Sequence, residues 1–351
     1  MLGAAGAKSD DEPRKPGTLS GTLQIEVHQD WNYRSEDRDN ETSQTFFKIE
    51  PEIEFQITEQ FSFYVHGVLT PVRDAEPGED RFFEDHGLYA EEVFLRFVED
   101  DLTVIAGKFT PRFGMAWEDA PGIWGRDVAE SHYKFIERVG FAGSYEFDLE
   151  AGGTHTFTAA AFFLDTSPAY HSLGRARAPS TRNRADGGVS NTEQLNSFAL
   201  AYDVEEIEAL PGLKAHAAYI DLARGRDGTA DQRGGVVGAL YELPVNDALT
   251  WVPLAEYALF RNAEGVAGQD RGILTVSSNL ILWEAWNLAL AASRVATDVP
   301  NAGQSRDHQF QATVGYRLMQ GLLIEGGWLI EEASDVLTHR LGAMVTYKQK
   351  F

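Results

Sequence analysis

Long segments in which apolar and polar residues alternate most constrain the fold of this chain. Residues 337–351 place a mostly apolar side chain at every second position from Leu337 to Phe351, with mostly polar residues between them. Residues 19–33 repeat the same period of two. Successive side chains of a β-strand point to opposite faces, so each segment predicts a strand with one apolar and one wet face. Both segments are longer than an ordinary globular strand.

The polar rows of the first two segments carry several charges. In residues 19–33 the apolar row ends at Trp31 and Tyr33, where an interfacial aromatic girdle would lie, and the other row holds Glu26 and Asp30. In residues 47–57 the apolar row starts at Phe47. The alternate row there consists of Lys48, Glu50, Glu52, Glu54 and Gln56. Three consecutive carboxylates on one strand face need water, so this face is expected to line a hydrated interior.

About sixteen segments show this alternation, which favours an antiparallel transmembrane β-barrel. A soluble sandwich would leave a sheet edge to be covered, whereas in a closed barrel the last strand pairs with the first and the apolar rows face lipid. The remaining segments are 61–69, 89–98, 102–108, 139–147, 154–164, 195–204, 213–222, 235–243, 249–260, 272–282, 286–295, 309–318 and 322–330.

The connections between these segments alternate in length along the chain. Outer-membrane barrels have short periplasmic turns and long extracellular loops, so the alternation supports the same fold and an even number of strands. The short connections are 58–60, 99–101, 148–153, 203–212, 244–246, 283–285 and 319–321, and the long ones include 34–45, 70–87, 109–138, 165–194 and 223–234.

Composition limits the class of protein. The 351 residues contain no composition break, so we predict one barrel domain at 18–351 after a disordered polar lead-in at 1–17, in which residues 2–7 resemble the end of a signal peptide. No apolar run is long enough for a membrane helix. The net charge of -24 argues against nucleic acid as a partner. With no cysteine, disulfides and thiol chemistry are excluded.

The end of the chain resembles the C-terminal signature of Gram-negative outer-membrane proteins, which end in Phe after apolar residues at alternate positions. The resemblance implies the outer membrane of a Gram-negative bacterium as the location, with lipid and lipopolysaccharide as partners. The resemblance to general porins, which rests on the third long connection described next, implies a homotrimer, for which small outward residues such as Ala215, Ala217 and Gly235 would allow close subunit contact.

The third long connection, 109–138, is rich in aromatic residues, among them Phe113, Trp117 and Trp124. So many aromatic side chains are costly to leave in solvent, so we expect the connection to fold into the lumen and narrow the bore. It follows the fifth strand and resembles the constriction loop of the sixteen-stranded general porins. The run from Gly107 to Gly114 is similar to the G-[KR]-F-x-P-x-F-G segment of the phosphate-selective porin family. The alternative is an external cap without a role in the pore.

Charged residues on this loop and on the inward rows are candidates for setting a transverse field in the pore. The constriction-loop candidates are Arg112, Glu118, Asp119, Arg126 and Asp127. The pore-wall candidates are Lys48, Glu50, Glu52, Glu54, Arg96, Lys108, Arg317 and Arg340. The fourth long loop adds an extracellular basic group that would funnel anions or bind lipopolysaccharide phosphates, or would simply be solvated: Arg175, Arg177, Arg182 and Arg184.

These features predict a porin for passive diffusion of ions and small hydrophilic solutes. Prominent carboxylates, without an inward ladder of basic residues, favour weak cation selectivity. The alternatives are a substrate-specific channel for an anion such as phosphate, a sugar or an organic acid, and an outer-membrane hydrolase. A hydrolase would need paired Ser and His, and His155 and His339 are isolated, so we predict no enzyme. No cofactor or metal motif is present, although divalent cations could bridge acidic loops to lipopolysaccharide.

Overall fold

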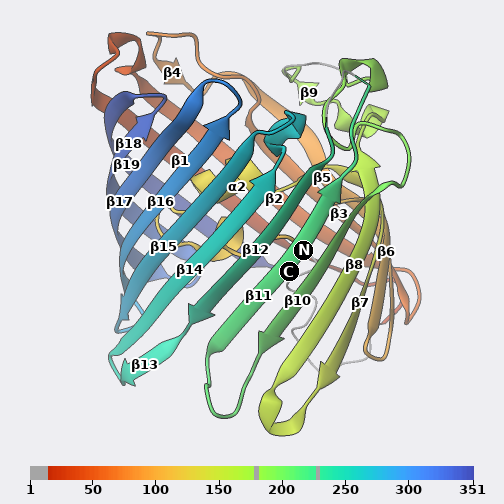
Figure 1. Ribbon diagram of the computed structural model, residues 1–351. Helices are drawn as coiled ribbons and strands as arrows, with labels where there is room; N and C mark the ends of the chain where they lie inside the picture. Colours follow the sequence, from red (N-terminus) through yellow and green to blue (C-terminus); the bar gives the residue numbers. More distant parts are fainter. Residues whose placement is uncertain (1–14, 178–181, 227–229) are drawn as a thin grey trace.

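Sixteen long strands form a closed antiparallel barrel in the computed structural model, which describes residues 15–177, 182–226 and 230–351 (Figure 1). The barrel strands are β1 (Leu19–Ser35), β2 (Ser43–Gln56), β3 (Phe61–Pro71), β5 (His86–Glu99), β6 (Leu102–Phe109), β7 (Arg138–Asp148), β8 (Thr154–Leu164), β10 (Ser197–Glu205), β11 (Leu213–Leu222), β12 (Gln232–Tyr241), β14 (Leu249–Arg261), β15 (Asp270–Leu282), β16 (Trp286–Val299), β17 (Gly303–Met319), β18 (Leu322–Ala333) and β19 (Val336–Lys350).

The remaining elements of the described residues are short. Three strands lie at the ends of the barrel: β4 (Arg81–Phe82), β9 (Leu173–Gly174) and β13 (Leu243–Asn246). Two α-helices are α1 (Ala116–Asp119) and α2 (Asp127–Tyr133). Five single 3₁₀ turns are η1 (Arg38–Asn40), η2 (Glu150–Gly152), η3 (Pro168–Tyr170), η4 (Arg184–Asp186) and η5 (Ala263–Gly265). None of these helices is long and apolar enough to cross a membrane.

The barrel closes between its first and last strands, as predicted. β1 pairs antiparallel with β19, with Val27 opposite Val345 and Ile25 opposite Tyr347. Its other edge pairs with β2, and every barrel strand is bonded to two neighbours. The closed ring leaves no sheet edge to be satisfied in lipid.

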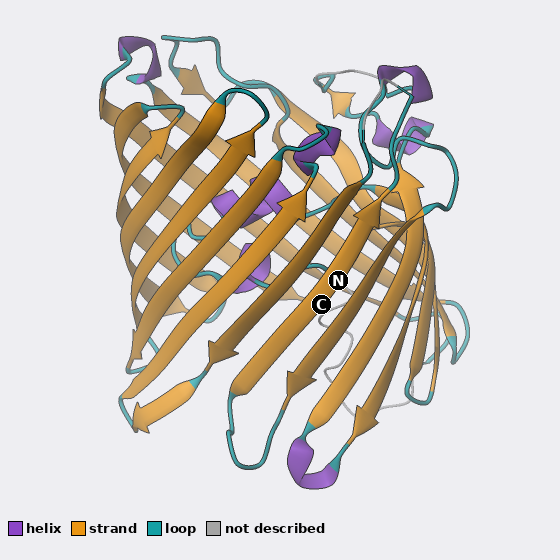
Figure 2. Ribbon diagram, viewed as in Figure 1, coloured by secondary structure: helices purple, strands orange, loops and turns teal. Residues whose placement is uncertain are grey.

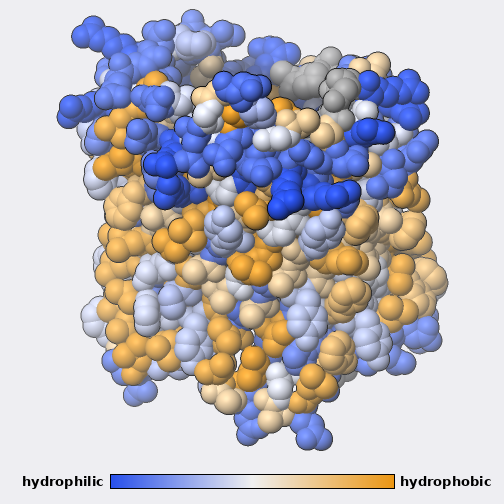
Figure 3. Space-filling model, viewed as in Figure 1, coloured by the Kyte–Doolittle hydropathy of each residue, from blue (hydrophilic) through white to orange (hydrophobic). Residues whose placement is uncertain are grey.

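The outward rows form an apolar belt. Figure 3 shows hydrophobic side chains gathered around the middle of the barrel, between hydrophilic zones at its two ends. Trp31 and Tyr33 are exposed near one end of the belt, and Trp251, Trp283 and Trp286 are exposed near the other. An apolar band flanked by aromatic residues is typical of a transmembrane barrel.

The connections confirm the predicted asymmetry only in the first part of the chain. We call the end of the barrel that carries the 72–85, 110–137 and 165–196 connections the outer side. The last two outer connections are tight, at 300–302 and 334–335, because β16 to β19 extend beyond the segments with clear alternation. Positive φ angles at Asn301, Ser334 and Asp335 are typical of such hairpin turns. Of the predicted lead-in, residues 1–14 lie outside the described residues.

Candidate functional site

Residues 109–138, hereafter the lumen segment, lie inside the barrel. Figure 2 shows two helices within the ring of strands, and in Figure 1 this part of the chain is yellow. Hydrogen bonds join the segment to inward-facing residues on strands from opposite parts of the ring. The partners are Asp30 on β1, Asp203 on β10, His216 on β11, Glu256 on β14 and Gln311 on β17.

The first attachment of the lumen segment is made by the buried carboxylate of Glu256. The backbone N–H groups of Met115 and Ala116 donate to it at 2.6 and 2.9 Å, and the Tyr133 hydroxyl donates at 2.6 Å. Met115 precedes α1, and no side chain of the segment caps that helix. Glu256 therefore supplies the acceptor that the first turn of α1 lacks, and it also holds the end of α2.

Aromatic packing reinforces this attachment. Phe113, Tyr133, Phe135 and the inward Phe260 of β14 form a cluster with ring centroids 5.6–6.5 Å apart. All four are at most 9% exposed. The expectation of polar inward rows is therefore wrong for this part of the wall, because the lumen segment packs there. The inward residues include Ile105, Phe162, Ile220, Leu222, Val236, Leu254 and Ile273.

The second attachment is at Trp124, on the far side of the lumen. Its indole N–H donates to Asp30 at 3.2 Å, while its backbone N–H and C=O bond to Gln311 and Gln309 at 3.1 and 3.0 Å. The ring packs against the backbone of β18 and β19, where only glycine leaves enough room. A Cβ atom on Gly342 would overlap the Trp124 ring.

Between these attachments, α2 presents charges to β1, β2 and β5. Lys134 Nζ lies 3.1 Å from Glu91 on β5, and Lys48 on β2 lies 3.0 Å from Glu50. Burial would lower the pKa of Arg126, but the carboxylates of Glu130, Glu26, Glu50 and Asp127 outweigh that effect and raise it. The side chains of this charged region thus belong to one electrostatic network. It comprises Glu26, Lys48, Glu50, Glu91, Arg126, Asp127, Glu130 and Lys134.

Four of these eight residues were sequence candidates, namely Lys48, Glu50, Arg126 and Asp127. Glu91 could not be found from alternation, because the pairing of β3 with β5 skips it at a bulge. The bulge places both Glu91 and Glu92 on the inner face, where they are 6% and 3% exposed. Glu26 lies on the predicted inward row of the first strand, and this position could have identified it as a residue of the charged region.

Asp127 has an unusual environment for a carboxylate. Although its side chain is exposed to the interior space, it lies deep in the protein at the start of α2. Desolvation, followed by the charge of Glu130, raises the pKa of Asp127 to about 7. A carboxylate with this pKa changes charge near neutral pH.

The other loop candidates lie on the opposite side of the segment. Arg112 is buried and pairs with Asp203 at 2.7 Å, and Glu118 lies 3.7 Å away. Arg112 and Glu118 border a cavity of about 900 Å³ toward the short turns, and eight of its 19 lining residues are acidic. Asp119 lines it too, and desolvation together with Glu118 raises the pKa of Asp119 to about 6. Arg112 therefore balances carboxylates and is not a free charge in the bore.

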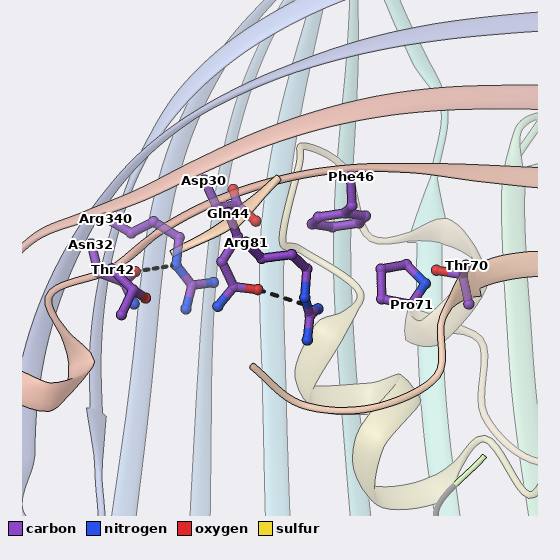
Figure 4. A pocket seen from close by; sticks show the side chains of 9 residues that line it. All are labelled: Asp30, Asn32, Thr42, Gln44, Phe46, Thr70, Pro71, Arg81 and Arg340. Atoms are coloured by element: carbon purple, nitrogen blue, oxygen red, sulfur yellow. Dashed lines mark hydrogen bonds between the residues drawn. The ribbon is translucent and has the colours of Figure 1, made fainter. Parts of the chain in front are cut away.

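The remaining wall candidates face inward at different heights. Glu54 pairs with Arg96 at 3.0 Å, and Glu52 accepts a hydrogen bond from Tyr64. Arg317 is exposed near the 320–321 turn. Arg340 lies on the outer side of Trp124 and donates to Asn32 at 2.7 Å. Figure 4 shows it in a polar pocket of about 290 Å³, across from Arg81.

Lys108 does not line the pore, which corrects the sequence prediction. It is 4% exposed and lies 2.9 Å from Glu137 and 3.0 Å from Asp165, because the 165–177 segment folds over it. Arg177 belongs to the same cluster. It forms two bonds with Glu137 and lies 4.2 Å from the centre of the Tyr89 ring.

The extracellular basic group is therefore largely neutralised within the protein. Arg175 pairs with Asp85 at 2.8 Å, and Arg182 lies 4.0 Å from Glu137. Arg184 lies in η4. With Arg177 enclosed by carboxylate and aromatic partners, the group does not form a free basic funnel.

The comparisons identify relatives of this fold. No protein-family model matches the chain, and no curated protein matches it. Solved structures match over nearly the whole length. Salmonella typhi OmpF, in complex with daunomycin, is similar with a TM-score of 0.62 and 14% identity, covering 95% of this chain and 98% of that one.

The chain has the fold of an outer-membrane porin. The channel DcaP of Acinetobacter baumannii matches with a TM-score of 0.56 and 12% identity over 95% of this chain and 96% of that one. OccK8 of Pseudomonas aeruginosa matches with a TM-score of 0.54 and 9% identity, covering 95% and 98%. The predicted porin-like barrel is thus confirmed, while the likeness to phosphate-selective porins stays a sequence resemblance.

Proposed function

We propose that this porin-like barrel forms a water-filled channel through the outer membrane of a Gram-negative bacterium. Ions and small hydrophilic solutes would diffuse through it passively. The observation that carries the proposal is the lumen segment, held at Glu256 on one side and at Trp124 on the other, with charged residues between the two attachments. Such an arrangement narrows the bore: apolar packing fills one side of it, and charged side chains line the side of β1, β2 and β5.

Weak cation preference is the selectivity that the charged region supports. Five carboxylates, Glu26, Glu50, Glu91, Asp127 and Glu130, stand against three basic groups, Lys48, Arg126 and Lys134. A surplus of fixed negative charge in a confined space raises the local concentration of cations. The acidic cavity on the other side of the lumen segment acts in the same direction.

Planar-bilayer recording of the purified protein tests both parts of the proposal. We expect stable single-channel steps, and a reversal potential in a KCl gradient with the sign for cation preference. Glu130→Gln should reduce that potential, whereas Glu284→Gln, in an exposed turn between β15 and β16, should not. The absence of any conductance would refute the channel, and anion preference in the unmodified protein would refute the selectivity.

We also propose that the barrel assembles as a homotrimer in contact with lipid and lipopolysaccharide. An apolar recess of about 540 Å³ on the outward face runs over β10, β11, β12 and β14. Small residues there, such as Ala217 and Gly235, would let a neighbouring barrel approach closely. Chemical cross-linking in native membranes should give a trimer, and recovery of monomer alone would contradict this assembly.

The surroundings of His155 and His339 favour a transport role for the protein over an enzymatic one. The Nδ1 atom of His155 lies 2.6 Å from the Tyr202 hydroxyl, and His339 lies beside the rings of Tyr33 and Trp328. Both thus have aromatic neighbours, and neither forms a hydrogen bond to serine within the described residues. An assay of the purified barrel with phospholipid and ester substrates should show no hydrolysis above background.

A further inference from the structure

A charged patch lies on the outward face of the barrel, toward the outer ends of β16, β17 and β18. Arg294 on β16 and His308 on β17 are opposite each other in the register, and both are exposed. Glu332 on β18 lies opposite His308. The hairpins that join these strands on the outer side are the tight turns at 300–302 and 334–335, so no long loop of these strands covers the patch. Outward residues of a membrane barrel face lipid, so the patch meets lipid molecules and not the solutes of the pore.

The register places this patch just beyond the outer aromatic girdle. Trp328 on β18, whose indole N–H donates to the Tyr33 hydroxyl at 3.2 Å, lies opposite Ala312 on β17. His308 lies four residues further toward the outer side on the same strand, or about 13 Å along it. Aromatic girdles mark the borders of the hydrocarbon layer. Arg294 and His308 therefore lie at the level of the lipid headgroups of the outer leaflet.

The guanidinium of Arg294 is available to a ligand. It forms no ion pair with any of the described residues, whereas the outward Arg233 on β12 pairs with Asp221 at 3.0 Å. Glu332 borders the same patch, but it lies two strands away from Arg294, with His308 between them. A guanidinium presents a planar fork of N–H donors that matches the oxygens of a phosphate group.

An apolar recess of about 410 Å³ adjoins the two basic side chains on the same outward face. Leu274, Val276 and Phe310 line it and are 40–42% exposed. Ala292 lies opposite Phe310, and its small side chain leaves room in the recess. A ligand that satisfies both parts of this surface would carry an anionic group joined directly to hydrocarbon chains.

We propose that Arg294, His308 and the recess form a binding site for lipid A, the phosphorylated and acylated sugar anchor of lipopolysaccharide. A lipid A phosphate would accept hydrogen bonds from the Arg294 guanidinium, and an acyl chain would occupy the recess. A zwitterionic phospholipid suits the site less well, because its own ammonium group already balances its phosphate. The site rests on the proposed outer-membrane location of the barrel, and it assigns one place to the lipid contact. It is separate from the recess over β10 to β14 that we propose for subunit contact.

Native mass spectrometry of the purified barrel in a neutral detergent tests the site without requiring conductance. When lipid A and phosphatidylethanolamine are titrated in equal amounts, we expect the barrel to retain lipid A preferentially. Arg294→Gln should weaken lipid A binding about fivefold, which is the contribution of one basic residue near a membrane surface. Arg233→Gln provides the matched control, because Arg233 is also an exposed outward residue but pairs with Asp221 and does not line the recess.

Ala292→Trp tests the recess separately from the charge. The added ring would fill the recess from the outward face, so lipid A binding should weaken while the melting temperature in detergent stays unchanged. If Arg294→Gln proves to be unstable, Ala292→Trp decides alone.

Three results would overturn the proposal. They are equal retention of lipid A and phosphatidylethanolamine, displacement of lipid A by an equal concentration of inorganic phosphate, and undiminished lipid A affinity in both variants. Lipid A binding by a barrel that conducts no ions would support the site while refuting the channel. A conducting barrel without preference for lipid A would refute the site and leave the channel standing.

Discussion

The attachment at Glu256 makes the position of the lumen segment testable by a single substitution. In Glu256→Gln one carboxylate oxygen becomes an amide NH₂, which cannot accept from the N–H of Met115 or Ala116. The remaining carbonyl oxygen can still accept hydrogen bonds from the donors on its side, but it carries no negative charge. The shape of the side chain is otherwise preserved, so the substitution removes charge and acceptor capacity without leaving a cavity.

The magnitude follows from the three hydrogen bonds. A bond to a charged group contributes about 1.5–3 kcal/mol and a neutral one about 0.5–1.5 kcal/mol. Losing one charged bond and weakening the other two from charged to neutral values therefore costs about 3.5–6 kcal/mol. Residues near Met115 and Tyr133 would then leave the wall more often, since the Trp124 attachment alone does not hold this half of the segment.

Single-channel recording and thermal unfolding in detergent measure this effect. Glu256→Gln should increase the noise of the open-channel current and shift its mean conductance. The melting temperature should fall as well. Glu284→Gln is the control, because Glu284 lies in the exposed turn between β15 and β16, away from the lumen segment. Unchanged conductance, noise and melting temperature in Glu256→Gln would show that this carboxylate does not hold the segment.

Three further results are expected. Gly342→Val should displace the Trp124 ring from the wall and alter conductance, whereas Gly326→Ala, whose added Cβ would meet nothing closer than 4.0 Å, should behave as the unmodified protein. Cation preference should rise between pH 6 and pH 8, since Asp127 with a pKa of about 7 is neutral below that pH and charged above it, and Asp127→Asn should reduce this rise in reversal-potential measurements to the smaller part that Asp119, with a pKa of about 6, contributes. Arg177→Lys should lower the melting temperature by a few degrees, because lysine loses the paired bonds and stacks less well between tyrosine rings.

The alternation of apolar and polar residues predicted the strands, their inward and outward faces and the pairing of the first strand with the last. It did so because lipid on one side of the wall and water on the other require that alternation. The prediction of polar inward residues failed where both faces of a strand are apolar. Leu259 is exposed on the outside of β14 while its neighbour Phe260 is buried inside, against the lumen segment. Both residues are apolar, so the sequence of β14 alone could not show that its interior is packed.

The candidate site was predicted less completely than the fold. Asp127 and Glu50 were recognisable as charges on the lumen segment and on an inward row. Interaction partners that are far apart in the sequence and meet only in the folded chain could not be recognised. Lys108 had the parity of a pore residue, but Glu137 and Asp165, which approach from two different loops, enclose it. Glu91 depended on a bulge that leaves no mark in the residue pattern.

The pairing of β1 with β19 has a consequence for how the barrel is made. Ser35 and Thr338 hydrogen-bond to each other although they are 303 positions apart in the chain. Bringing such distant segments together costs loop-closure entropy before any contact compensates for it, so ring closure is expected to be a slow, late event in folding. Until then both terminal strands expose unpaired backbone groups, which favours association with other chains. Folding of this barrel should therefore be especially sensitive to any factor that shields those two edges before they meet.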